Sequence, residues 1–255
     1  MRINDTIESI RSTYRAIAFI LRIPVFIVGL FIQPLYLYWH MQDEKERISR
    51  RASFARRLGL TLDLNIRRRM KKTYPFLRKV NGGGQYALNI MTGKYQGHDV
   101  TLFDYHTRRT AWSANIWEYS QWIAHDYQSF LVVNLGRDFP ALSIANEFKV
   151  FGILPRLADA LGIGDIDFES HEFSERFKVR SADKKFAYDF CNVHMMEHLM
   201  GLRVLHLPIG VESSALFIGI DSSLRMQDVE DNLDWLLAIR ERMPSYLFTD
   251  RTKGS

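Results

Sequence analysis

A long apolar run near the N-terminus constrains this chain more than any other feature of its sequence. Residues 16–39 read AIAFILRIPVFIVGLFIQPLYLYW, and Arg22 is the only charged residue among them. As a helix, this run extends over about 36 Å, which is enough to cross a hydrocarbon core of roughly 30 Å. Tyr36, Tyr38 and Trp39 end the run with the side chains that gather at membrane interfaces. The run therefore predicts a single transmembrane helix.

Other interpretations of the same run were weighed against a spanning helix. Pro24 and Pro34 are compatible with a helix that breaks inside the bilayer or re-enters one leaflet, and this alternative stays open. A cleaved signal peptide is disfavoured, because the sequence LYWH at residues 37–40 offers no small-residue cleavage site. A buried helix of a soluble protein is disfavoured, because an apolar run of this length is typical of a membrane span.

The basic residues on the two sides of the run predict its orientation. Three arginines precede the run, and six basic residues follow it within about 20 positions. Cytoplasmic flanks carry the excess of Lys and Arg, so the longer C-terminal part is expected inside the cell. The predicted location is therefore the cell membrane, with a single pass and a cytoplasmic soluble domain.

Charge is distributed unevenly along the chain. Residues 43–79 hold thirteen basic and four acidic side chains, a net charge of +9, whereas residues 80–255 hold seventeen basic and twenty-three acidic ones, a net charge of −6. The basic character thus belongs to one stretch, which argues against a nucleic-acid-binding domain. Cys191 is the only cysteine, so an internal disulfide is excluded.

A basic juxtamembrane segment is predicted over residues 40–73. Ile48, Ala52, Ala55 and Leu58 follow helical spacing, so the segment begins as a basic amphipathic helix that Gly59 is expected to end. One interpretation is attraction to anionic lipid headgroups, worth about 1 kcal/mol for each basic residue near the surface. In the other interpretation, the segment is a solvated linker whose basic residues only set the orientation of the transmembrane helix. The candidate lipid-contacting residues are Arg47, Arg50, Arg51, Arg56, Arg57, Arg67, Arg68 and Arg69.

The rest of the chain predicts an α+β fold: a soluble domain of antiparallel strands with C-terminal helices, following the N-terminal transmembrane helix. Apolar alternation and β-branched residues predict the strands, and helical spacing predicts the helices. Strands are expected at 85–93, 97–107, 127–136, 141–146, 176–180 and 215–221, and helices at 147–161, 183–200 and 226–243. Asp183 is expected to cap the second of these helices. The sequence thus divides into an N-terminal tail (1–15), the transmembrane helix (16–39), the basic juxtamembrane segment (40–73), the soluble domain (74–246) and a disordered tail (247–255).

Two stretches resemble a group of uncharacterised bacterial proteins. The first is GHDVTLFDYHT at 97–107, and the second is the segment 165–199, where matches to the group's pattern fall at Glu172, Phe173, Phe177, Val179, Asp183, Met196 and Glu197. Members of this group are membrane-anchored proteins that carry a domain of unknown function. The resemblance implies an anchor and a folded domain over about 75–220, and it supplies no activity, cofactor or catalytic residue.

The sequence HMMEH at 194–198 has the form of a zinc-hydrolase motif. On a helix, His194 and His198 share a face and would bind the metal, while Glu197 would activate a bound water. No third ligand can be identified from spacing alone, since Glu212, Glu230 and Glu241 are all candidates by type. The favoured interpretation is an amphipathic helix with histidines at its edge, so no cofactor is predicted and zinc remains the alternative.

These observations predict a membrane-tethered cytoplasmic interaction or scaffold domain that is not an enzyme. Its expected partners are the lipid bilayer, anionic headgroups and an unknown protein, with no nucleic acid. A nucleophile-elbow motif, a P-loop and a dinucleotide-binding fingerprint are all missing from the sequence. Two alternatives remain: a membrane-bound zinc hydrolase, and a regulator that binds anionic lipid.

Overall fold

The computed structural model describes residues 45–80, 82–112, 121–146, 165–201, 208–220 and 226–249. The chain divides into two compact units, Met1–Ser53 and Phe54–Ser255. The predicted span at 16–39 and the predicted helix at 147–161 both lie outside the described residues. Of the helices that the described residues form, none combines the length and the apolarity that a membrane crossing requires.

A helix over residues 45–57 leads into the second unit. Gly59 follows it with φ of +71°, in the left-handed region that favours glycine and commonly ends helices. The side chains of Phe54, Ala55 and Leu58 are buried. The amphipathic helix and its stop at Gly59 therefore agree with the prediction.

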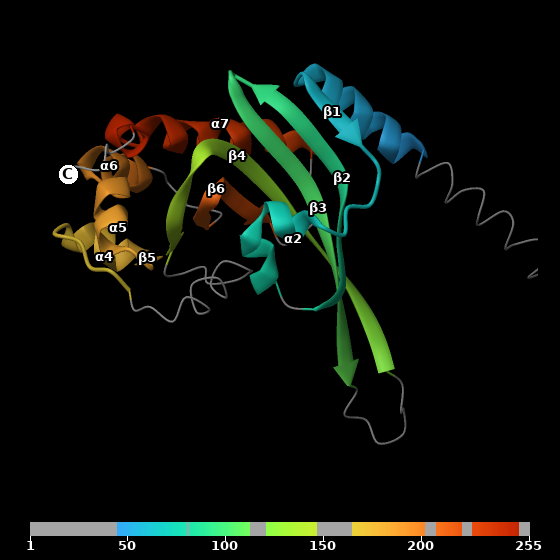
Figure 1. The fold of residues 1–255 in the computed structure, drawn as a ribbon, viewed down its shortest axis with the longest axis horizontal. Coiled ribbons are helices and arrows are strands. Elements are labelled where there is room, and N and C mark those ends of the chain that lie inside the picture. The colour runs from blue at the N-terminus through green and yellow to red at the C-terminus, as the bar shows by residue number, and fades with distance from the viewer. Residues whose placement is uncertain are drawn as a thin grey trace, which may run out of the picture. The chain divides into compact units, whose positions relative to one another are not determined.

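Six antiparallel strands form the sheet of the second unit (Figure 1). The first five pair in chain order: β1 (Leu60–Asp63), β2 (Gly83–Tyr95), β3 (His98–Trp112), β4 (Gln121–Asn146) and β5 (Phe177–Ser181). The sixth, β6 (Ile209–Ile220), pairs with β4. Strand β1 lies inside the predicted basic juxtamembrane segment (40–73), so the sheet takes in residues before position 74.

Strand β4 bends, and its two halves pair with different neighbours. Its first half pairs with β3 and its last residues pair with β5, while β6 follows both halves along the opposite edge. The register with β6 shifts between Asn134 and Phe139, and Gly136 in this stretch has φ of +73°. Such bulges bend a strand and increase its twist, so the sheet curls around its middle (Figure 1).

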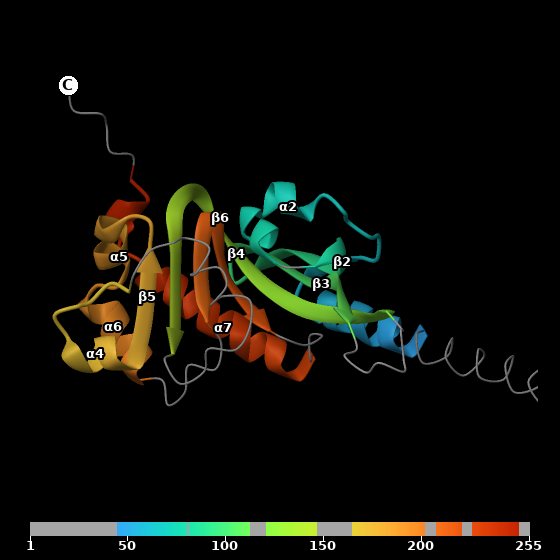
Figure 2. The ribbon, with the colours of Figure 1, turned by 90° about the horizontal axis from the view of Figure 1, so that it is seen from below.

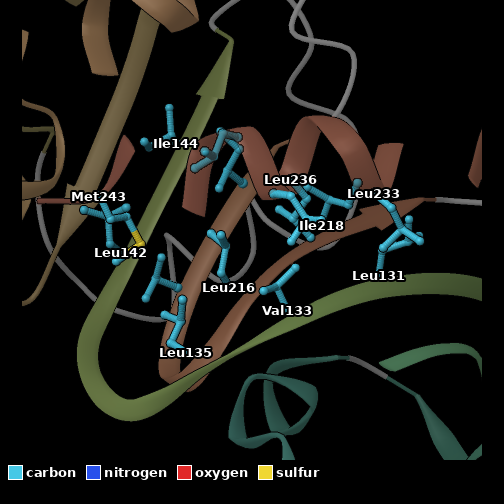
Figure 3. Packing of buried hydrophobic residues seen from close by; sticks show 14 of the residues in the cluster. Leu131, Val133, Leu135, Leu142, Ile144, Leu216, Ile218, Leu233, Leu236 and Met243 are labelled. Carbon is cyan, nitrogen blue, oxygen red and sulfur yellow. The ribbon is translucent and has the colours of Figure 1, made fainter. Parts of the chain in front are cut away.

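Helix α7 (Met226–Arg242) covers one face of the curled sheet. Alternate residues of a strand point to the same face, which brings Leu131 and Val133 of β4 beside Ile218 of β6. Leu233 and Leu236 of α7 pack against this layer, as Figure 3 shows. The helix predicted for 226–243 is confirmed, and Met243 and Pro244 follow its last turn.

A short 3-10 helix, η1 (Pro75–Lys79), covers the opposite face, next to α2 (Met70–Thr73) (Figure 2). Its Phe76 is fully buried and stacks on Phe217 of β6, with ring centroids 3.7 Å apart. Phe103 and Phe130 complete this aromatic layer. The connection between β1 and β2 is therefore held firmly to the sheet.

The remaining helices lie beyond β5: α4 (His171–Arg176), α5 (Lys184–Phe190) and α6 (Val193–Gly201), with η2 (Ser245–Leu247) after α7. Asp183 caps α5 by accepting from the Phe186 amide, as predicted. The single helix expected from 183 to 200 is instead two, because Asn192 accepts a bond from the Met195 amide and starts α6. The α+β class, with antiparallel strands and C-terminal helices, is confirmed.

Candidate functional site

The loop between β1 and α2 is held by the carboxylate of Asp63. One carboxylate oxygen accepts from the backbone and side-chain amides of Asn65, at 2.8 and 2.7 Å. The other accepts from Nε and Nη2 of Arg67, at 3.1 and 2.6 Å. The hydrogen bond from Arg67 is the main reason why the pKa of Asp63 lies below its ordinary value. These bonds give the loop a defined conformation.

The backbone of Arg67 also joins the loop to the sheet. Its N–H donates to the carbonyl of Ala87 at 2.8 Å, and the N–H of Ala87 donates to the carbonyl of Arg67 at 3.0 Å. This isolated bridge places the loop beside β2, twenty residues further along the sequence. The following arginines and α2 are thereby positioned over the edge of the sheet.

A cleft of about 690 Å³ lies between this loop, α2 and β2, and we call it the arginine cleft. Its lining combines three arginines, three apolar side chains and three further polar residues. The arginines are Arg67, Arg68 and Arg69, the apolar residues are Ile66, Met70 and Ile90, and Asp63, Thr73 and Thr92 complete the lining. Cationic and apolar groups thus face the same space.

The cleft carries a positive charge that is only partly neutralised. Arg67 is paired with Asp63, whereas Arg68 and Arg69 are exposed and have no acidic partner in the part of the chain that the structure describes. Residues 63–73 hold five basic side chains and one acidic side chain, a net charge of +4. Guanidinium groups bind phosphate and carboxylate oxygens, often in pairs of parallel hydrogen bonds. The arrangement therefore suits an anion that has an apolar portion.

The other predicted lipid-contacting arginines lie on the helix over residues 45–57. Arg47, Arg50 and Arg51 belong to the first unit, where Arg50 lies 3.5 Å from Glu46 and Arg51 is buried. Arg56 and Arg57 belong to the second unit, and Arg57 donates to Glu230 of α7 at 2.8 Å. The structure thus gathers Arg67, Arg68 and Arg69 around one cleft, while Arg57 is engaged within the fold.

The sequence analysis missed the apolar part of the cleft. The stretch LTLDLNI at 60–66 alternates strictly between apolar and polar residues, which is the signature of a strand. Both interpretations of the basic juxtamembrane segment, lipid contact and a solvated linker, left this strand out. The alternation would have indicated β1 and the projecting side chains after it, but it could not have indicated Ile90 and Thr92, which come from β2.

The predicted zinc motif lies on α6, and its members face different surroundings. His194 and Glu197 are exposed, with 3.8 Å between Nδ1 and Oε2. His198 is partly buried, and burial, with a smaller effect of Arg242, lowers its pKa. Burial also raises the pKa of the neighbouring Cys191 thiol. Across the described residues, no three His, Cys, Asp or Glu side chains lie close enough together to hold a metal ion.

Two of the three carboxylates that could be a third zinc ligand by type have other partners. Glu212 of β6 accepts from Nζ of Lys79 at 3.2 Å, which ties η1 to the sheet, and Glu230 bonds to Arg57. Glu241 lies on α7, near its end. The zinc hydrolase thus gains no support from the geometry of the described residues.

No protein-family model matches the chain, and no curated protein resembles its sequence. Among solved structures, the fold resembles that of the mycobacterial trehalose monomycolate transport factor A, TtfA, with a TM-score of 0.52. The two chains are 12% identical, and the alignment covers 76% of this chain and 92% of TtfA. At this level of identity, the similarity concerns the fold alone.

Proposed function

We propose that this chain is a membrane-tethered, non-enzymatic domain that binds an anionic lipid in the arginine cleft. The observation that carries the proposal is the cleft itself, in which exposed Arg68 and Arg69 share one space with Ile66, Met70 and Ile90. The apolar run at 16–39 supplies the tether, and the excess of basic residues after it favours a cytoplasmic position for the domain.

The two kinds of side chain in the cleft correspond to the two parts of a lipid. The phosphate of a headgroup would accept hydrogen bonds from Arg68 and Arg69, while the first part of an acyl chain would lie on Ile66, Met70 and Ile90. A volume of about 690 Å³ falls within the range of small-molecule sites, roughly 300–1,000 Å³. The hydrogen bonds between Asp63 and Arg67 hold the loop in the conformation that forms the cleft.

The fold similarity supports the class of ligand. TtfA is named as a transport factor for trehalose monomycolate, so a related arrangement of strands and helices serves a lipid-linked role in that protein. We carry over the lipid class and not the particular lipid, since the two chains share only 12% identity. The arginines are what direct our proposal toward an anionic headgroup.

Native mass spectrometry of the full chain in a neutral detergent tests the proposal. Phosphatidylglycerol or phosphatidylcholine is added, and bound lipid is counted across a concentration series. The double variant Arg68→Ala/Arg69→Ala removes two charges worth about 1 kcal/mol each near a lipid headgroup. We therefore expect its affinity for phosphatidylglycerol to fall about thirtyfold, because each 1.4 kcal/mol is tenfold. Binding of phosphatidylcholine should change much less.

A matched control separates the cleft from general charge. Arg78 and Lys94 are exposed and lie outside the cleft lining, so Arg78→Ala/Lys94→Ala removes the same two charges elsewhere. This variant should bind phosphatidylglycerol like the wild type. If both double variants lose affinity equally, or if neither does, the cleft is not the lipid site.

A further inference from the structure

Two aliphatic side chains project into solvent beside the arginine cleft. Leu64 is 48% exposed and Ile66 is 56% exposed, and both lie on the loop that joins β1 to α2. Single exposed apolar residues are common on protein surfaces. These two differ because they stand two positions apart on one short loop that is followed directly by basic residues.

The loop holds these side chains outward in a defined conformation. Asp63 accepts the hydrogen bonds of Asn65 and Arg67, and the backbone bridge between Arg67 and Ala87 fixes the far end of the loop. A surface that is already ordered loses little conformational entropy when it binds. The exposure of Leu64 and Ile66 is thus built into the loop.

The charge around the loop identifies the kind of surface that it fits. Arg68, Arg69, Lys71 and Lys72 follow the two aliphatic residues within a few positions, and residues 63–73 carry a net charge of +4. Basic side chains are attracted to a leaflet that contains anionic lipid, and neighbouring aliphatic groups enter the boundary between headgroups and acyl chains. Two exposed aliphatic side chains followed closely by cationic ones are complementary to such a bilayer.

We propose that residues 64–66 form a membrane-docking loop for an anionic bilayer surface. Leu64 and Ile66 enter the headgroup boundary, while Arg68, Arg69, Lys71 and Lys72 lie among the headgroups. This inference rests on the proposed function, because docking brings the mouth of the arginine cleft against the lipid that it takes. A tether at 16–39 raises the effective concentration of the loop at the same surface.

An environment-sensitive dye at position 64 tests the docking. Leu64 does not line the cleft, so Leu64→Cys leaves the lipid site intact. The native cysteine, Cys191, is buried, and the substitution Cys191→Ala removes it. The cysteine at position 64 is then the one site for a nitrobenzoxadiazole label. The labelled full chain is placed in nanodiscs of phosphatidylcholine, with or without phosphatidylglycerol. We expect a severalfold rise and a blue shift of the emission only in the discs that contain phosphatidylglycerol.

The same dye at an unrelated exposed position gives the control. Ser245 is exposed at the start of η2, and Ser245→Cys in the same background should respond equally in both kinds of disc. An equal response of position 64 in neutral and anionic discs overturns the proposal. Unchanged emission in both kinds of disc also overturns it, and would indicate that a protein covers Leu64 and Ile66.

The experiment distinguishes failure of this inference from failure of the proposed function. If the detergent-solubilised chain binds phosphatidylglycerol but the dye at position 64 does not respond, the docking proposal is wrong and the lipid site in the arginine cleft is supported. If the dye responds but the chain binds no phosphatidylglycerol in detergent, the lipid site in the cleft is wrong and the docking proposal is supported. Leu64→Ser adds a further check, since it removes one apolar side chain without changing the charge and should leave lipid binding in detergent unchanged.

Discussion

A buried carboxylate shows how single residues support the sheet beneath these surfaces. Asp104 of β3 is only 2% exposed, and it accepts hydrogen bonds from Oγ of Ser129 at 2.6 Å and from Nδ2 of Asn89 at 2.9 Å. Asn89 has φ of +52° at a shift of register between β2 and β3. A buried charge is tolerated when such donors surround it, so the three residues stabilise one another.

Removing this carboxylate should destabilise the domain. In Asp104→Ala, the buried Ser129 and the half-buried Asn89 lose their shared acceptor, and each buried group left unsatisfied costs about 1–3 kcal/mol. We expect the free energy of unfolding to fall by about 2–4 kcal/mol. Urea denaturation of the full chain in neutral detergent, followed by circular dichroism, measures the change.

Asp99 on the same strand provides the comparison for this substitution. It is exposed, so Asp99→Ala should change the free energy of unfolding by no more than about 0.5 kcal/mol. Equal effects of the two substitutions would show that the bonds of Asp104 contribute nothing specific to stability.

A phenol in the same strand illustrates how burial acts on a neutral group. Tyr105 is 1% exposed, and burial raises its pKa to about 12. Its hydroxyl donates to Oε1 of Gln85 at 3.4 Å, and the side-chain amide of Gln85 donates to the carbonyl of Val80. Through this chain of bonds, an aromatic residue of β3 helps to hold the end of η1 in place.

At the scale of elements, the close packing of β6 against η1 depends on a glycine. Gly210 pairs with Ser143 of β4, and a Cβ atom at this position would overlap the ring of Phe217. That ring stacks on Phe76 of η1. The missing side chain at position 210 therefore allows the aromatic layer to close, and η1 leads directly from the α2 helix that lines the arginine cleft.

We expect Gly210→Ala to lower the free energy of unfolding by about 1–3 kcal/mol, because the added methyl group must displace a buried ring. Thermal unfolding in neutral detergent measures this loss. Gly201 ends α6 and has open space around it, so Gly201→Ala should be neutral or slightly stabilising. A stable Gly210→Ala variant would show that Phe217 moves at little cost.

Two elements differ between the prediction from sequence and the structure. The helix expected from 183 to 200 divides at Cys191 and Asn192. The side chain of Asn192 accepts a hydrogen bond from the Met195 amide, which has no backbone partner in the first turn of α6. Strand β1 falls within the predicted basic juxtamembrane segment, although its stretch alternates between apolar and polar residues. In both cases the local signal was present, and a competing feature of the same stretch concealed it.

At the scale of the whole molecule, the proposed tether would determine where the domain acts. The run at 16–39 lies outside the described residues, so its spanning conformation stays a prediction from composition. It is argued from solvation, since about two dozen apolar residues are more stable in lipid than in water. The domain from Phe54 onward has its own sheet and its own core.

Fractionation of lysed cells tests the tether. The full chain should sediment with membranes and resist alkaline carbonate, which releases proteins held only at the surface. A variant that lacks residues 16–39 should be released by carbonate, because only the docking loop and the basic segment would remain to bind. A full chain that stays in the supernatant without detergent would contradict the tether and the topology inferred from it.

The sequence by itself determined those features that depend on near neighbours. Alternation predicted most of the strands, helical spacing predicted α7, and Gly59 and Asp183 marked a stop and a cap. The concentration of basic charge before residue 80 is likewise a property of composition. Such signals are local because a strand or a helix has a fixed repeat along its own chain.

Only the tertiary structure decided how these elements meet. The arginine cleft requires Arg67 to bridge to Ala87 and requires Ile90 of β2 to lie beside Met70 of α2. The curl of the sheet requires one strand, β4, to pair with three others. These contacts join residues far apart in sequence, and they depend on register and packing, which no local repeat encodes. The arginines were visible in the sequence, but the cleft that they line was not.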